Sequence, residues 1–83
     1  MEIKYRKQAQ KMLRAMQPAQ SRAIIEALRK LAEDPSRTDV DVRPMVNVAG
    51  FRLRVGKWRA IFLVAEDILW VERIAARGDV YKA

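Results

Sequence analysis

The sequence contains no cysteine and no histidine. Without cysteine there is no disulfide, no thiolate nucleophile and no thiolate-bound metal, and without histidine the commonest neutral-pH base and metal ligand is missing. Most familiar catalytic constellations are therefore excluded, and we expect neither a metal nor a cofactor. No apolar run approaches the ~20 residues of a membrane span, and the polar segment Met1–Gln10 is unlike a signal peptide. We therefore expect a cytoplasmic protein without a membrane partner.

Acidic residues are few beside basic ones. Ten Asp and Glu stand against 17 Lys and Arg, so the formal net charge is +7. This excess favours a polyanionic partner, which can be nucleic acid, an acidic membrane surface or an acidic protein. A length of 83 residues, with 51% apolar and 33% charged residues, predicts a single globular domain over residues 1–83.

The first part of the chain predicts a strand and two helices. Residues 2–6 alternate loosely between polar and apolar, as a short strand does. A first helix is predicted by an apolar stripe at helical spacing: Ala9, Met12, Leu13 and Met16. Pro18 suits the first turn of a second helix, whose apolar face runs to about residue 33 before Asp34 and Pro35 end it. The two helices should pair as a hairpin.

The second part of the chain predicts a sheet. A polar loop is expected over 34–41, followed by a strand over 42–48 that Pro44 interrupts. Three more strands are expected over 51–55, 58–65 and 68–76. The fold class is therefore α+β: an N-terminal strand, a helical hairpin, then an antiparallel β-meander sheet with the helices packed on one face.

The basic residues gather on one predicted hairpin. Gly56 and Lys57 fit a two-residue turn, and in that register Arg54 lies opposite Arg59. Arg52, Arg54 and Arg59 then share one face of the sheet, because side chains alternate along a strand. The other face, which we expect to pack on the helices, carries Phe51, Leu53, Val55, Trp58, Ala60 and Phe62.

Two interpretations of the arginine-bearing face remain open. Alternating Arg residues are typical of a solvated sheet face or of an edge strand protected from aggregation. However, Ile61 and Leu63 fall on the same face and leave apolar surface uncovered. Like charges directly across a strand pair are also unfavourable, on a scale of roughly 0.2 to 1 kcal/mol. A bound anionic partner, or strong curvature of the sheet, would account for both features.

Two segments of the chain carry a more specific pattern. Phe51–Arg59 reads aromatic-basic-x-basic, tight turn, aromatic-Arg, and Ile74–Tyr81 ends in Arg and Val-Tyr. In these segments the chain resembles the RelE/ParE superfamily of type II toxin-antitoxin toxins, in its RelE-like branch. The resemblance implies a RelE-like fold and a ribosome-dependent endoribonuclease that cuts mRNA when a 2′-hydroxyl attacks the adjacent phosphate. It also implies a monomeric toxin inhibited in a complex with its cognate antitoxin. The ParE-like branch implies an alternative, a non-catalytic inhibitor of DNA gyrase.

The resemblance implies roles for individual residues. Arg59 and Arg77 would stabilise the transition-state phosphate, Arg52 and Arg54 would bind RNA phosphates or the leaving side, and Tyr81 would stack on or orient a base or ribose.

Further contacts are expected around this set. Lys57 and Arg43 would contact RNA, Arg43 as a ribosomal RNA contact, and an acidic antitoxin segment would cover Ile61 and Leu63. Some relatives carry a histidine where this chain has Ala76, so Tyr81, Lys57, Asp79 or solvent would move the proton. We reject Arg as the general base because a guanidinium stays protonated at neutral pH.

Overall fold

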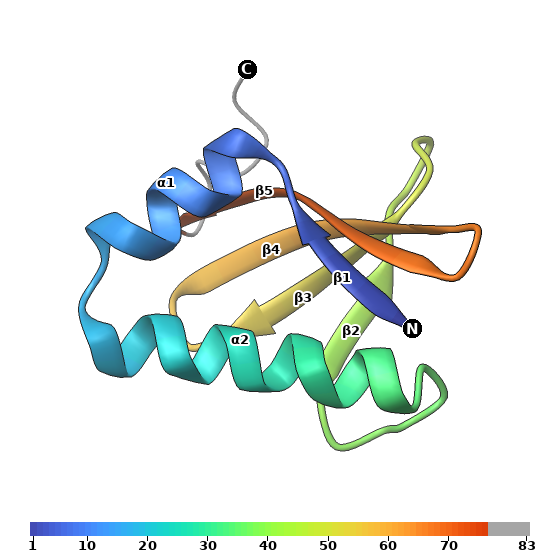
Figure 1. The fold of residues 1–83 in the computed structure, drawn as a ribbon. Coiled ribbons are helices and arrows are strands. Elements are labelled where there is room, and N and C mark those ends of the chain that lie inside the picture. Colours follow the sequence, from blue (N-terminus) through green and yellow to red (C-terminus); the bar gives the residue numbers. More distant parts are fainter. Residues whose placement is uncertain (77–83) are drawn as a thin grey trace.

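A computed structural model describes residues 1–76 and shows two helices packed against a sheet (Figure 1). The elements in chain order are β1 (Glu2–Tyr5), α1 (Lys7–Ala15), α2 (Pro18–Glu33), β2 (Asp41–Pro44), β3 (Phe51–Val55), β4 (Trp58–Ala65) and β5 (Ile68–Ala76). The predicted α+β class and the predicted limits of the last three strands are confirmed.

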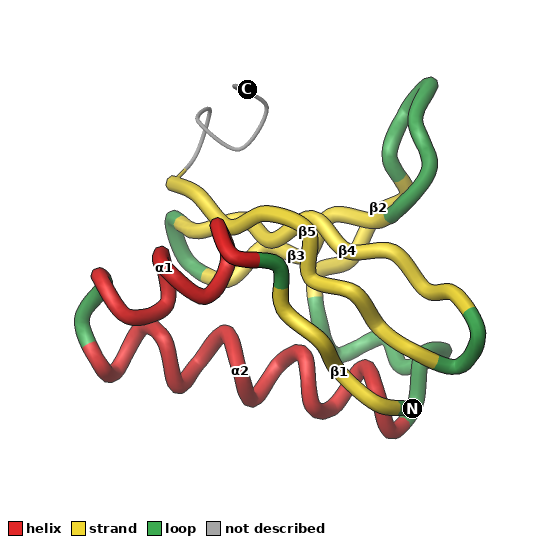
Figure 2. The backbone as a smooth tube through the Cα atoms, turned by 45° about the horizontal axis from the view of Figure 1, so that its top comes forward, coloured by secondary structure: helices red, strands yellow, loops and turns green. Residues whose placement is uncertain are grey.

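The five strands form one mixed sheet in the order β1-β5-β4-β3-β2. The strands from β2 to β5 pair antiparallel, as predicted for the meander, whereas β1 pairs parallel with β5 at the sheet edge. Both helices lie on one side of the sheet (Figure 2). The opposite side, which we call the open face, carries the arginines of the β3–β4 hairpin.

Local residues set the two ends of α2. Pro18 occupies the first turn of α2, where its missing N–H costs no intrahelical hydrogen bond. At the other end, the N–H of Asp34 donates to the carbonyl of Lys30 and closes the last turn. No helix within residues 1–76 is long and apolar enough to cross a membrane.

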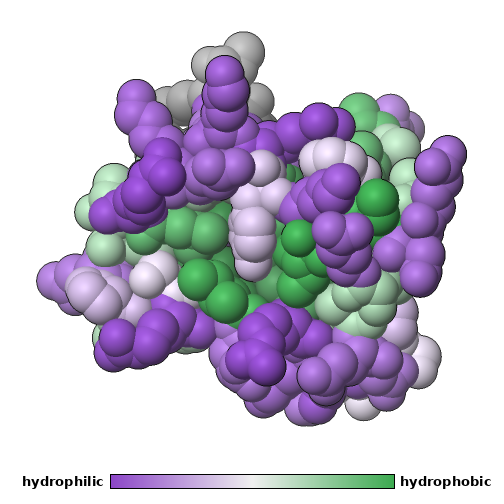
Figure 3. Space-filling view, viewed as in Figure 1, coloured by the Kyte–Doolittle hydropathy of each residue, from purple (hydrophilic) through white to green (hydrophobic). Residues whose placement is uncertain are grey.

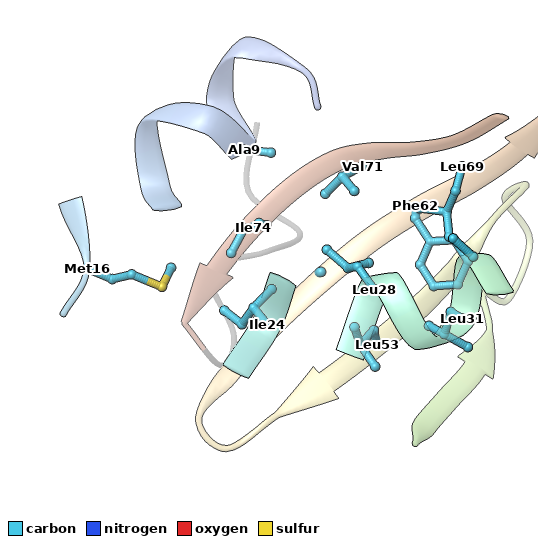
Figure 4. Close-up of a cluster of buried hydrophobic side chains, with 12 residues drawn as sticks. Ala9, Met16, Ile24, Leu28, Leu31, Leu53, Phe62, Leu69, Val71 and Ile74 are labelled. Carbon is cyan, nitrogen blue, oxygen red and sulfur yellow. The ribbon is translucent and has the colours of Figure 1, made fainter. Parts of the chain in front are cut away.

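The core fills the space between the helices and the inner side of the sheet (Figure 4). Its largest fully buried side chains are Ile24, Leu28, Leu53, Val71, Leu69 and Ile74. Burying one such side chain contributes about 1.5 to 3 kcal/mol. The predicted helix stripes are confirmed, since Ala9 and Met16 are also buried. A one-residue slip of β3 would exchange Leu53 for an arginine in this core, so packing sets the hairpin register.

The segment after Pro44 differs from the prediction. A strand was expected to continue through 42–48, but β2 ends at Pro44 and residues 45–50 form a loop. Asn47 and Gly50 have positive φ values of 64° and 113°, which breaks the extended conformation. A Cβ on Gly50 would lie 2.9 Å from the backbone carbonyl oxygen of Phe62, so only glycine fits there. Val46 and Val48 are therefore exposed instead of lying in a strand.

The helix side of the sheet is incompletely covered. Phe51 was expected to pack on the helices, but it is 38% exposed and stacks on Phe62 with ring centroids 5.4 Å apart. Hydrophobic surface is visible between α2 and the strands (Figure 3). A groove of about 330 Å³ on this side of the sheet is lined by Met1, Leu31, Pro35, Val42, Phe51, Phe62, Val64 and Leu69. The C-terminal end of α2 leaves this part of the sheet open.

Candidate nucleic-acid interface

The β3–β4 hairpin brings the predicted arginines together on the open face. Arg54 pairs with Arg59 and Arg52 pairs with Ile61, which confirms the predicted register. The edge strand β2 extends this face, because Arg43 lies directly opposite Arg52. The turn uses Gly56 at a φ of 59°, a value that glycine adopts without steric cost.

Strand β5 adds residues that the sequence reasoning missed. Arg73 pairs with Ile61, and Trp70 pairs with Leu63, so both belong to the open face. A bulge between these two pairs explains why Arg73 was missed, since strict alternation from Trp70 would have placed it in the core. The sequence does carry a signal, because the buried residues of β5 include Val71 and Ile74, three residues apart instead of two.

The parallel pairing of β1 brings further cations to the open face. Lys4 lies beside Trp70 in register, and its Nζ is 5.4 Å from the indole centroid. The Arg6 guanidinium lies 4.2 Å from the same centroid and its Nε donates to Glu72 Oε2 at 3.1 Å. Each cation attracts the negative face of the ring by about 0.5 to 1 kcal/mol at exposed sites. Trp70 thus has two cations over its indole.

Within residues 1–76, few carboxylates offset this positive charge. Asp41 pairs with Arg54 in the β2–β3 register, and its Oδ1 lies 3.8 Å from Arg43 Nε, with both side chains largely exposed. Such exposed pairs contribute little, because water and salt screen them. The Nε of Arg73 is buried and has no hydrogen-bond partner within residues 1–76. An anion bound on this face would offset the positive charge that these few carboxylates leave.

Not every predicted site residue joins this cluster. Lys57 is exposed at the hairpin turn, and its Nζ lies 5.9 Å from the ring of Trp58. Trp58 precedes Arg59 in β4, so its indole belongs to the helix side of the sheet. The Lys57 ammonium therefore lies beside that indole and not beside the Arg54–Arg59 pair. Arg77 and Tyr81, along with Asp79, lie outside the described residues.

Comparison with known proteins identifies the fold. No protein-family model matches the sequence, and no curated protein matches it. Three similar solved structures are two RelE–RelB complexes, from Pyrococcus horikoshii and Methanococcus jannaschii, and YafQ from Escherichia coli.

All three are matched along nearly their whole length. The Pyrococcus complex gives 24% identity and a TM-score of 0.73 over 93% of this chain and 94% of that chain. The Methanococcus complex gives 20% identity and a TM-score of 0.75 over 94% of each chain. YafQ gives 15% identity and a TM-score of 0.76 over 96% of this chain and 97% of that chain. The resemblance to RelE toxins is thus confirmed at the level of the fold, and the chain has a RelE-like fold.

Proposed function

We propose that this protein is the toxin of a type II toxin-antitoxin system and cleaves mRNA on the ribosome. The observation that carries the proposal is the cross-strand pair Arg54–Arg59, which stands in a basic open face on a RelE-like fold. Arginine suits this task because its planar fork matches the oxygens of a phosphate.

The proposed reaction is an in-line transfer within the RNA. The 2′-oxygen loses its proton and bonds to the adjacent phosphorus, the bond from phosphorus to the 5′-oxygen breaks, and that oxygen takes up a proton. Products are a 2′,3′-cyclic phosphate and a 5′-hydroxyl. Catalysis then requires a fixed strand geometry and cations for the charge that builds on the phosphorane.

We assign Arg77 from the resemblance alone, and the other cations from the resemblance and their places in the sheet. Arg59 would hold the non-bridging oxygens together with Arg77, while Arg52 and Arg54 would bind neighbouring phosphates. Arg73, on the same face, would add a further positive charge. Since each guanidinium is charged at all relevant pH values, this arrangement needs no metal.

Proton transfer must proceed without histidine. Tyr81 or solvent would accept the proton of the 2′-hydroxyl, whereas the position of Lys57 beside Trp58 does not support that residue as the base. The single-turnover rate should then lack a protein ionisation step near pH 6.5, the region where a histidine would titrate.

An antitoxin of acidic character is the proposed inhibitor. The open face combines cations with the apolar residues Ile61, Leu63 and Trp70. An acidic segment that also carries apolar side chains would neutralise the cations and bury these apolar residues at the same time. The Pyrococcus and Methanococcus proteins were solved as complexes of RelE with RelB, which supports a protein partner here.

Mapping transcript ends by primer extension, after brief induction of the toxin, tests the proposal. We expect new 5′ ends inside translated frames, and their loss when the start codon of the mapped transcript is removed. Intact transcripts combined with inhibited DNA supercoiling would instead identify a gyrase poison and overturn the proposed reaction.

A further inference from the structure

A hollow lies at the edge of the open face beside the β2–β3 loop. Residues 45–50 rise from the sheet on the side away from the helices (Figure 2). The hollow measures about 610 Å³, within the range of pockets that hold small molecules. It is lined by Arg43, Pro44, Met45, Val46, Val48 and Arg52.

Two cations stand side by side at one wall of this hollow. Arg43 and Arg52 occupy directly opposite positions on β2 and β3. The ion pair of Arg43 with Asp41 is long, at 3.8 Å, and the Arg43 side chain is 73% exposed, so solvent screens it. Phosphate oxygens match the planar geometry of a guanidinium group, so one phosphate can contact two neighbouring arginines at once.

The other residues that line the hollow are apolar. Val46 is 81% exposed and Val48 is 59% exposed, the two largest exposures among the large hydrophobic residues in the described part of the chain. The loop that carries them is closed by a hydrogen bond from the Met45 N–H to the Gly50 carbonyl at 2.9 Å. Apolar side chains of this kind pack on the flat surface of an unstacked base.

We propose that this hollow binds one nucleotide of the RNA beside the scissile phosphate. The phosphate lies between Arg43 and Arg52, and the base lies against Val46 and Val48. Arg52 precedes Arg54 by two residues, about 7 Å along the strand, so the site adjoins the Arg54–Arg59 pair. The inference rests on the proposed function. In-line attack requires the RNA strand to leave its stacked helical geometry, and a base bound in the hollow would favour the unstacked arrangement.

RNA accounts for the hollow better than an acidic peptide does. A peptide carboxylate would fill the space between the two guanidinium groups, but a single side chain would leave most of the volume empty. A nucleotide supplies the anion and a broad apolar surface at a fixed separation. The hollow is also continuous, through Arg52, with the face assigned to RNA phosphates.

Binding of a short single-stranded RNA tests the inference apart from cleavage. The probe is a fluorescein-labelled oligoribonucleotide with a 2′-deoxy residue at the cleavage position, and its affinity is measured by fluorescence anisotropy. Val46→Ser combined with Val48→Ser should weaken binding about fivefold without changing the salt dependence. Arg43→Ala should weaken binding and lower the slope of log K against log salt by about one. Val64→Ser, 44% exposed on the helix side, is the matched control and should bind as the wild type does.

Abasic probes identify the bound base. The wild type should bind a probe that lacks one base more weakly than it binds the intact probe. The double valine variant should bind the intact and the abasic probe equally. Equal binding of intact and abasic probes by the wild type, or unchanged binding by the valine variant, would overturn the inference. Loss of antitoxin binding with intact RNA binding would assign the loop to the protein partner and would also overturn it. A wild type that binds as expected but leaves mRNA uncut on ribosomes would refute only the proposed function.

Discussion

Arg54 and Arg59 lie directly opposite each other across the β3–β4 hairpin, and neither strand contains an acidic residue. Like charges in opposite positions destabilise a strand pair by a few tenths of a kcal/mol or more. Asp41 lies opposite Arg54 on β2 but is exposed, so it offsets this repulsion only in part.

Replacing Arg59 should separate stability from activity. The Arg59→Ala protein should unfold at or slightly above the wild-type temperature in low salt, because one repulsion is removed. Its cleavage rate on programmed ribosomes should fall about 100- to 1,000-fold, the scale of losing one transition-state donor. Arg29→Ala, on the exposed side of α2, is the control and should retain full activity. Full toxicity of the Arg59 variant would refute the assigned role.

A negative charge at Ile61 should weaken the antitoxin complex. Ile61 lies between Arg52 and Arg73 on the sheet. The carboxylate of Ile61→Asp would repel an acidic partner, and it would also lose its hydrating water when the complex forms. We expect the affinity for the product of the adjacent reading frame to fall at least about tenfold in calorimetry. Ala19→Asp adds the same charge on α2 and should bind normally. Equal affinities for the two variants would argue against a partner on the open face.

Gln8 should stabilise the end of β5 that β1 does not reach. Its Nε2 donates to the Ile74 carbonyl at 2.8 Å, and the Ile74 N–H donates to its Oε1 at 2.9 Å, whereas β1 pairs with β5 only as far as Val71. Gln8→Leu leaves both backbone groups unpaired in a half-buried place. We expect a loss of roughly 2 kcal/mol and a fall of about 10 °C in Tm.

The control for this prediction lies on the same helix. Gln10 donates to the carbonyl of Tyr5 at an exposed position, where water replaces the lost donor. Gln10→Leu should therefore change Tm by only a few degrees in thermal unfolding followed by circular dichroism. Equal Tm values for the Gln8 and Gln10 variants would mean that the β5 edge does not depend on the carboxamide.

The ion pair in the α2–β2 loop predicts an acid dependence. Arg37 holds both carboxylate oxygens of Asp39, and this hydrogen bonding lowers the pKa of Asp39 to about 2 from an ordinary 3.8. Because the folded pKa is lowered, the stabilisation is present above pH 4 and is lost as the pH falls through about 2. The Tm difference between the wild type and Asp39→Asn should vanish over that window, and its size should be small at this exposed site. A difference that stays constant from pH 6 to pH 2 would exclude the pair as its source.

Local sequence patterns were sufficient for much of the fold. The spacing of Ile24, Leu28 and Leu31 specifies one side of a helix, and Pro18 specifies where that helix begins. In the hairpin, the alternation of Leu53 with Arg52 and Arg54 allows only one register, because any slip by one residue buries charge. These features could be predicted because each depends on neighbours within a few positions along the chain.

The tertiary structure decided what no local pattern specifies. Parallel pairing of β1 with β5 joins segments 66 residues apart and places Lys4 and Arg6 over Trp70. The bulge in β5 brings Arg73 to the open face, and the left-handed conformations in residues 45–50 convert an expected strand into the wall of a hollow. The periodicity of a strand predicts which of its faces is apolar. It does not predict which strand pairs with it, because strand order depends on how the whole core packs. The sequence by itself therefore determined most of the elements and the arginine hairpin, and only the packed sheet decided which other side chains share its open face.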